Sequence, residues 1–177
     1  MKNSKIQKIV LTALLAAMTF IGTVIIKVPS PTGGYIHPGD SIVILSGILL
    51  GPINGFLAAA IGSMLADMYA GYMGFMFATF IIKGLAALIS SFTFHFCIKA
   101  LKGKLQPLTL SITSIAAGIV VTIGYFIFEA FIMELGVPAA LAGVPFNLIQ
   151  NAFGLILVVI LYPLVHKRIQ NVMYTDK

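Results

Sequence analysis

The sequence predicts an all-α integral membrane protein, a bundle of six transmembrane helices. Of its 177 residues, 59% are hydrophobic and 9% are charged, and the mean hydropathy is +1.06. So much apolar surface cannot be hidden inside a single water-soluble core. Several windows also approach or exceed the roughly 20 apolar residues that a helix needs to cross about 30 Å of hydrocarbon. The chain therefore belongs in a membrane.

Five apolar windows supply the six predicted spans. Four of them are each suited to one crossing: residues 6–26, 75–98, 108–131 and 140–165. The fifth, residues 41–66, is too long for one comfortable crossing and is interrupted by Gly51 and Pro52. Proline removes a helix donor and disfavours helix at the residue before it. We therefore expect two short, tilted helices in this window.

Positively charged residues form three clusters that predict the orientation. The clusters are Lys2, Lys5 and Lys8 before the first span, Lys99, Lys102 and Lys104 after the fourth, and His166, Lys167 and Arg168 after the sixth. The positive-inside rule places all three clusters, and with them both termini, in the cytoplasm. This requires an even number of crossings between the first two clusters, which the interruption at Gly51 supplies. The net charge of +6 is then an orientation signal, and nucleic-acid binding is not needed to explain it.

Several kinds of chemistry lack their sequence signatures. There is no G-x-x-x-x-G-K-[ST] phosphate loop for ATP hydrolysis and no H-E-x-x-H pair for zinc. The single cysteine, Cys97, is interpreted as a small buried apolar residue. We therefore expect no metal, no cofactor and no ATPase activity of its own. The connections are short and no internal repeat is found, so residues 1–177 are predicted to form one transmembrane domain.

The few polar residues within the spans gather toward one side of the membrane. The loop at 27–39 follows the first span and so lies outside, with the turns at 71–74 and 136–143. Asp67 and Lys83 lie on either side of the turn at 71–74. At 1.5 Å per residue they are roughly 6 Å and 13 Å below it. Because a lysine stem can reach toward the surface, we expect the two groups at one level.

The fifth and sixth spans add further polar groups at this outer level. Tyr125 and Glu129 share a helix face, and Asn147, Asn151 and Gly154 recur at i, i+4 and i+7 just after Pro145, which suits a first helical turn. Charges at membrane depth usually face an interior cavity, so we predict a cup that opens outward. The alternative is a packing ion pair between Asp67 and Lys83, with Glu129 and the asparagines as interhelical contacts of about 1 kcal/mol each.

Small residues form a separate pattern. Gly47, Gly51 and Gly55 are spaced by four residues, and the first span contains Ala13-x-x-x-Ala17. Such faces let membrane helices approach closely. We interpret the glycines as internal packing, whereas the two alanines suit either internal packing or a partner subunit.

The segment "GGYIHPGDSIVILSGILLGPINGFLAAAIGSMLADMYAGY", followed by "TFIIKG", resembles the substrate-binding S components of energy-coupling factor (ECF) transporters. It is most similar to the small members grouped with carriers of pyridoxine or hydroxymethylpyrimidine. The resemblance covers essentially the whole chain. It implies a multi-pass protein of the bacterial plasma membrane that captures a vitamin and works with a transmembrane coupling protein (EcfT) and two ATPase subunits.

The resemblance also implies roles for individual residues. It assigns Tyr35, His37 and Asp40 to a lid or its hinge, and it assigns Ala13 and Ala17 to the partner interface. The proposed substrate-binding residues are Tyr35, His37, Asp40, Asp67, Lys83, Tyr125, Glu129, Asn147 and Asn151. For Asp40 an alternative from the residues alone is a cap on the second helix, whose N-terminal amides favour an anion.

The substrate and the mechanism leave alternatives open at this point. Carboxylates, one lysine, amides and tyrosines, with no tryptophan in the chain, suit a small polar heteroaromatic ring, for which pyridoxine or a related pyrimidine is our hypothesis. Riboflavin and pantothenate are alternative vitamins. A stand-alone proton-coupled carrier would use Asp67 or Glu129, and an intramembrane enzyme would use Asp40.

Overall fold

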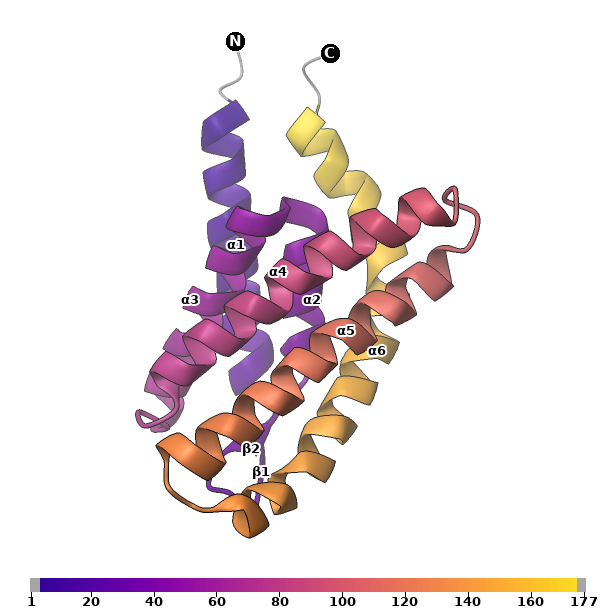
Figure 1. The fold of residues 1–177 in the computed structure, drawn as a ribbon. Coiled ribbons are helices and arrows are strands. Elements are labelled where there is room, and N and C mark those ends of the chain that lie inside the picture. Colours follow the sequence, from indigo (N-terminus) through magenta and orange to yellow (C-terminus); the bar gives the residue numbers. More distant parts are fainter. Residues whose placement is uncertain (1–3, 175–177) are drawn as a thin grey trace.

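The computed structural model describes residues 4–174, and in this range the apolar windows form six α-helices (Figure 1). They are α1 (Ser4–Val24), α2 (Asp40–Leu50), α3 (Pro52–Ala70), α4 (Met76–Ala100), α5 (Gln106–Ile127) and α6 (Val137–Tyr174). Lys2 lies outside the described residues, as do the side chains of Lys167 and Arg168.

The helices present apolar side chains outward as well as inward. Ile9, Phe96 and Ile119 are more than half exposed, whereas the interior is built largely from small residues such as Ala58, Ala59 and Ala86. A surface of this kind suits lipid rather than water. Five helices have the length and composition to cross a membrane, and α2 is a shorter apolar helix. The predicted all-helical membrane fold is confirmed.

The predicted interruption between α2 and α3 is also confirmed. Gly51 separates Leu50 from Pro52 and adopts a φ of +83°, a backbone angle that side-chain-bearing residues rarely take. Pro52 then occupies the first position of α3, where its missing N–H is no loss. The chain can thus reverse within one residue.

Glycines allow α2 to pack closely against its neighbours. A Cβ added at Gly47 would overlap the backbone carbonyl of Ala87 on α4, and one at Gly55 would lie 2.6 Å from the Cα of Gly47. The prediction of internal packing is therefore confirmed for Gly47 and Gly55, whereas Gly51, around which a Cβ would meet nothing within 4 Å, serves the turn instead.

The chain ends and the polar turns lie at opposite ends of the bundle. Figure 1 shows the start of α1, the end of α6 and the α4–α5 connection at one end, with the α3–α4 turn and the α5–α6 turn at the other. The α1–α2 loop, residues 25–39, lies at this second end. It contains a short antiparallel pair, β1 (Val28–Pro29) and β2 (Tyr35–Ile36), so the predicted loop is partly a hairpin.

One predicted boundary at this end is wrong, and one helix changes its type there. Helix α6 begins at Val137, so most of the predicted turn at 136–143 is helical and Pro145 lies inside the helix rather than in its first turn. Membrane helices tolerate internal proline because neighbouring groups can satisfy the freed carbonyl. Helix α5 continues into a π-helical turn, Phe128–Ile132, which the α-helical periodicity did not indicate.

Substituting Gly47 tests the close packing of α2 on α4. We expect Gly47→Ala to lower the free energy of unfolding by about 1–3 kcal/mol, because the added methyl group must force the helices apart. Gly74→Ala is the matched control, since a Cβ at that position meets nothing within 4 Å. Unfolding of both variants in detergent micelles measures the difference. Equal stabilities would contradict the close approach.

Candidate functional site

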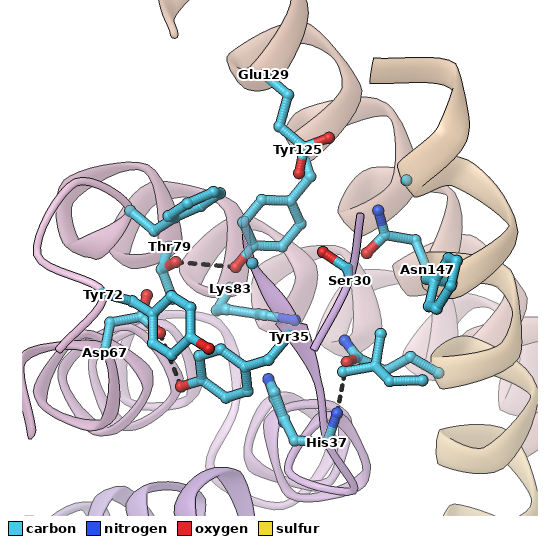
Figure 2. Close-up of a pocket in the computed structure, with 16 residues that line it drawn as sticks. Ser30, Tyr35, His37, Asp67, Tyr72, Thr79, Lys83, Tyr125, Glu129 and Asn147 are labelled. Atoms are coloured by element: carbon cyan, nitrogen blue, oxygen red, sulfur yellow. Dashed lines mark hydrogen bonds between the residues drawn. The ribbon is translucent and has the colours of Figure 1, made fainter. Parts of the chain in front are cut away.

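A polar cavity lies at the end of the bundle that carries β1 and β2 (Figure 2). It is lined by residues from the α1–α2 loop, α3, the α3–α4 turn, α4, α5, the π-helical turn and α6. Seven of the nine predicted binding residues line it: Tyr35, His37, Asp67, Lys83, Tyr125, Glu129 and Asn147. The polar or aromatic residues that sequence reasoning missed are Ser30, Tyr72, Phe75, Thr79, Phe146 and Gln150. Asp40 and Asn151 are not part of the lining.

The side chain of Tyr35 fills much of this cavity. Its ring centroid lies 4.5 Å from that of Tyr72 and 5.4 Å from that of His37, and its hydroxyl donates a 2.8 Å hydrogen bond to Asp67 Oδ1. Only about 30 Å³ remains for the centres of water-sized molecules. This suffices for one or two waters, whereas pockets for organic ligands are typically about 300 Å³ or larger. The cavity must therefore widen to hold a ring-sized ligand.

The buried lysine pairs with Asp40 and not with Asp67. Lys83 Nζ lies 2.5 Å from Asp40 Oδ1, and both side chains are buried, whereas Asp67 instead receives the Tyr35 hydroxyl. The alternative of a packing ion pair between Asp67 and Lys83 is therefore wrong, whereas both residues line the cavity as predicted. Depth along the helices placed Asp67 and Lys83 at one level but did not show that the start of α2 packs against α4 beside the lysine.

Asp40 is not a helix cap either. Gly39 occupies the N-cap position of α2 and makes no side-chain cap hydrogen bond, while the Asp40 carboxylate points to Lys83 and to Gln150. The first turn of a helix still favours this negative charge through the helix dipole. Asp40 thus stabilises the buried lysine beneath the cavity.

Gln150 connects this ion pair to the α1–α2 loop. Its Nε2 donates to Asp40 Oδ2 at 2.7 Å, and its Oε1 accepts the backbone N–H of His37 at 2.8 Å. The sequence did contain a signal for it. Gly143, Phe146, Asn147 and Gln150 recur at i, i+3, i+4 and i+7, the spacing of a single helix face.

The interhelical alternative holds for Asn151. Its Nδ2 donates to the carbonyl of Gly118 and to Thr122 Oγ1, both at 2.9 Å, and so links α6 to α5. The i, i+4 pattern predicted that Asn151 lies beside Asn147 in the cavity. The residue that does so is Gln150, because the cavity lies on the side of α6 that carries it.

Glu129 lies on the π-helical turn and faces the cavity. Its Oε1 accepts a 2.8 Å hydrogen bond from Thr32 Oγ1 of the α1–α2 loop. Its Oε2 is buried and has no hydrogen-bond partner among the described residues. Gly143 makes room for this oxygen, because a Cβ there would lie 2.9 Å from it. Such π-helical turns occur frequently at functional sites.

His37 is held as the neutral imidazole. Its Nδ1 accepts a hydrogen bond from the backbone N–H of Gly39 at 3.1 Å, so the ring proton is on Nε2. Burial lowers the pKa of His37 to about 3; nearby Asp40 opposes this shift and Lys83 adds to it. The ring therefore faces the cavity with an N–H donor and no charge.

These features define a class of protein: a membrane helix bundle with a polar cavity at one end, beneath a loop. The solved structure of the S component of a bacterial ECF transporter matches the fold with a TM-score of 0.63 at 20% identity, covering 98% of this chain and 99% of that chain.

Sequence comparison identifies the family. The model of the family described as ECF-type riboflavin transporter, S component, matches residues 3–167, and the chain belongs to this family. It is thus a multi-pass membrane protein, the S component of a vitamin transporter and not an enzyme. The thiamine precursor transporter HmpT of Lactococcus lactis is 26% identical over 94% of this chain and 92% of its own length. An uncharacterized Pyrococcus woesei protein is 28% identical over 77% of this chain and 86% of its own.

The neutral state of His37 predicts a pH-dependent stability. Between its native pKa of about 3 and an unfolded value near 6.5, only the unfolded chain binds the proton, so acid destabilises the fold. We expect His37→Asn, whose carbonyl can replace Nδ1, to remove up to about 2 kcal/mol of the loss seen between pH 7.5 and 5. Chemical unfolding in micelles at both pH values measures this. Identical losses in the two proteins would contradict it.

Proposed function

We propose that this S component captures a small heteroaromatic vitamin or precursor, hydroxymethylpyrimidine or pyridoxine, from outside the cell. The single observation that carries the proposal is the polar cavity itself, to which separate helices and one loop contribute side chains. The domain of residues 1–177 then acts as the binding subunit. Delivery into the cell takes place together with an ECF coupling protein and two ATPase subunits.

The proposed orientation has six crossings and cytoplasmic termini. Lys5 and Lys8 lie near the start of α1, and Lys99, Lys102 and Lys104 lie around the α4–α5 connection, at the same end of the bundle (Figure 1). The positive-inside rule places this end in the cytoplasm. The polar cavity at the other end then opens toward the medium.

The choice of a small ring is supported by the shape of the cavity and by one relative. Tyr35, Tyr72, Phe75 and Tyr125 bring aromatic rings to the cavity, which suits stacking on a planar ligand. HmpT is named for a thiamine precursor. Riboflavin, which appears in the family's name, and pantothenate are larger molecules and would require more of the cavity wall to move.

The α1–α2 loop acts as the lid in this proposal. Three hydrogen bonds hold it over the cavity: Tyr35 to Asp67, Thr32 to Glu129, and the His37 N–H to Gln150. Two of these use the carboxylates proposed to bind the ligand. A ligand that competes for those carboxylates would therefore alter the lid at the same time.

The proposed contact with the coupling protein uses the outer face of α1. Ala13 and Ala17 are exposed and line a groove with Leu57, Ile61 and Leu65 of α3. Because both side chains are exposed, the four-residue spacing of these alanines does not serve packing inside the bundle, which was the alternative interpretation. A groove floored by small residues lets a partner helix approach closely.

Binding to the purified protein tests the cavity. We expect Glu129→Ala and Asn147→Ala each to weaken binding of the vitamin at least about tenfold, because each removes a hydrogen-bonding group from the lining. Asn151→Ala is the control, since that side chain contacts α5 instead. Isothermal titration with hydroxymethylpyrimidine and pyridoxine measures the affinities. If the Asn151 variant alone lost binding, the site would be misplaced.

Transport in proteoliposomes tests the partner. We expect uptake to require the coupling protein and ATP, and Ala13→Leu with Ala17→Leu to abolish uptake while leaving binding intact, because the larger side chains would fill the groove. Ala152→Leu, an exposed alanine on α6, is the matched control. Uptake by this chain alone, driven by a pH gradient, would instead favour the proton-coupled carrier.

A further inference from the structure

The charges around the polar cavity do not balance. The described residues that line it include two carboxylates, Asp67 and Glu129, and one lysine, Lys83. Lys83 is fully buried and bonded to Asp40, whose second oxygen is taken by Gln150. The positive charge of Lys83 is therefore already paired with a carboxylate that is not part of the lining. Among the described lining residues, Asp67 and Glu129 have no second cation to offset them.

Both carboxylates have an unused acceptor. The α1–α2 loop supplies one hydroxyl to each, from Tyr35 to Asp67 Oδ1 and from Thr32 to Glu129 Oε1, both at 2.8 Å. The second oxygens, Asp67 Oδ2 and Glu129 Oε2, are buried without a hydrogen-bond partner among the described residues. A buried acceptor without a partner is costly, and a ligand N–H or O–H would relieve that cost.

The two acceptors lie on different sides of the cavity. Figure 2 shows Glu129 beyond the ring of Tyr125 and Asp67 on the side of Tyr35 and Tyr72. A ligand lying between these rings would meet one carboxylate toward each end. Thr79 and Tyr125, joined by a 2.9 Å hydrogen bond, lie between the two and add hydroxyls but no charge.

We infer that the cavity selects a neutral or cationic ring with hydrogen-bond donors at two ends, that Glu129 Oε2 accepts one of them, and that phosphorylated forms are rejected. This deepens the proposed function and rests on it. Asp40 acts as a positioning residue, because its pairing with Lys83 keeps the positive charge from a ligand. A phosphate would bring negative charge beside two carboxylates, and such like-charge contacts are strongly unfavourable.

Matched pairs of ligands test this selection. The probes are pyridoxine with pyridoxine 5′-phosphate, and hydroxymethylpyrimidine with its phosphate, measured by isothermal titration on the full chain in detergent. We expect the unphosphorylated member of at least one pair to bind at least about a hundredfold more tightly, as expected for like charges held close together. Equal affinity within the pair that binds would overturn the inference while leaving the vitamin-binding function in place.

Two variants assign the effect to residues. Glu129→Gln keeps the shape but weakens the acceptor, so binding of the unphosphorylated ring is expected to fall at least about tenfold. Glu134→Gln makes the same change at an exposed position of the α5–α6 turn and is the control. Unchanged affinity in the Glu129 variant would overturn the role of its Oε2.

Asp40→Asn leaves Lys83 without its counter-charge and is expected to narrow the preference against phosphate about tenfold or more, a direction that general destabilisation would not produce. An unchanged preference in a folded Asp40 variant would overturn the positioning role. The wild-type comparison still tests the selection if this variant does not fold. If riboflavin bound and none of the four probes did, both the inference and the proposed substrate class would be overturned.

Discussion

The ion pair between Lys83 and Asp40 is the interaction on which the polar end of the structure depends. A charge at this depth is tolerated only when it is paired and hydrogen-bonded, and here the partner comes from the first residue of α2 while Gln150 of α6 satisfies the other oxygen. Three helices are therefore held together by one network. Gln150 extends it to the backbone of His37, so the position of the α1–α2 loop follows from the same interaction.

The two parts of the bundle are stabilised in different ways. Around α2, helices approach through glycines and alanines, and the fit leaves no room for a methyl group at Gly47. At the polar end, two carboxylates each keep one acceptor without a partner in the part of the chain that the structure describes, and the loop is held by a few hydrogen bonds. A tightly packed region can offset the free-energy cost of these unpaired acceptors, which are typical of binding sites.

Helix α3 contributes to both proposed surfaces. Asp67, near its end, lines the polar cavity, whereas Leu57, Ile61 and Leu65 line the groove beside Ala13 and Ala17. The residues of the two surfaces are otherwise distinct. One helix thus connects the proposed ligand site with the proposed partner surface. Because the two surfaces share no residue, each can be mutated without changing the other.

The sequence by itself determined the membrane class, the apolar helices, the interruption at Gly51 and the family, because these depend on local composition, proline geometry and a contiguous motif. It also indicated seven of the sixteen residues that line the cavity, since polar groups in an apolar span have few other places to face. Which carboxylate meets Lys83, and whether Gln150 or Asn151 turns inward, was decided only by the tertiary structure. Those choices depend on how helices rotate and pack against one another. The π-helical turn that contains Glu129 is likewise a departure from the regular helical period that the sequence did not indicate.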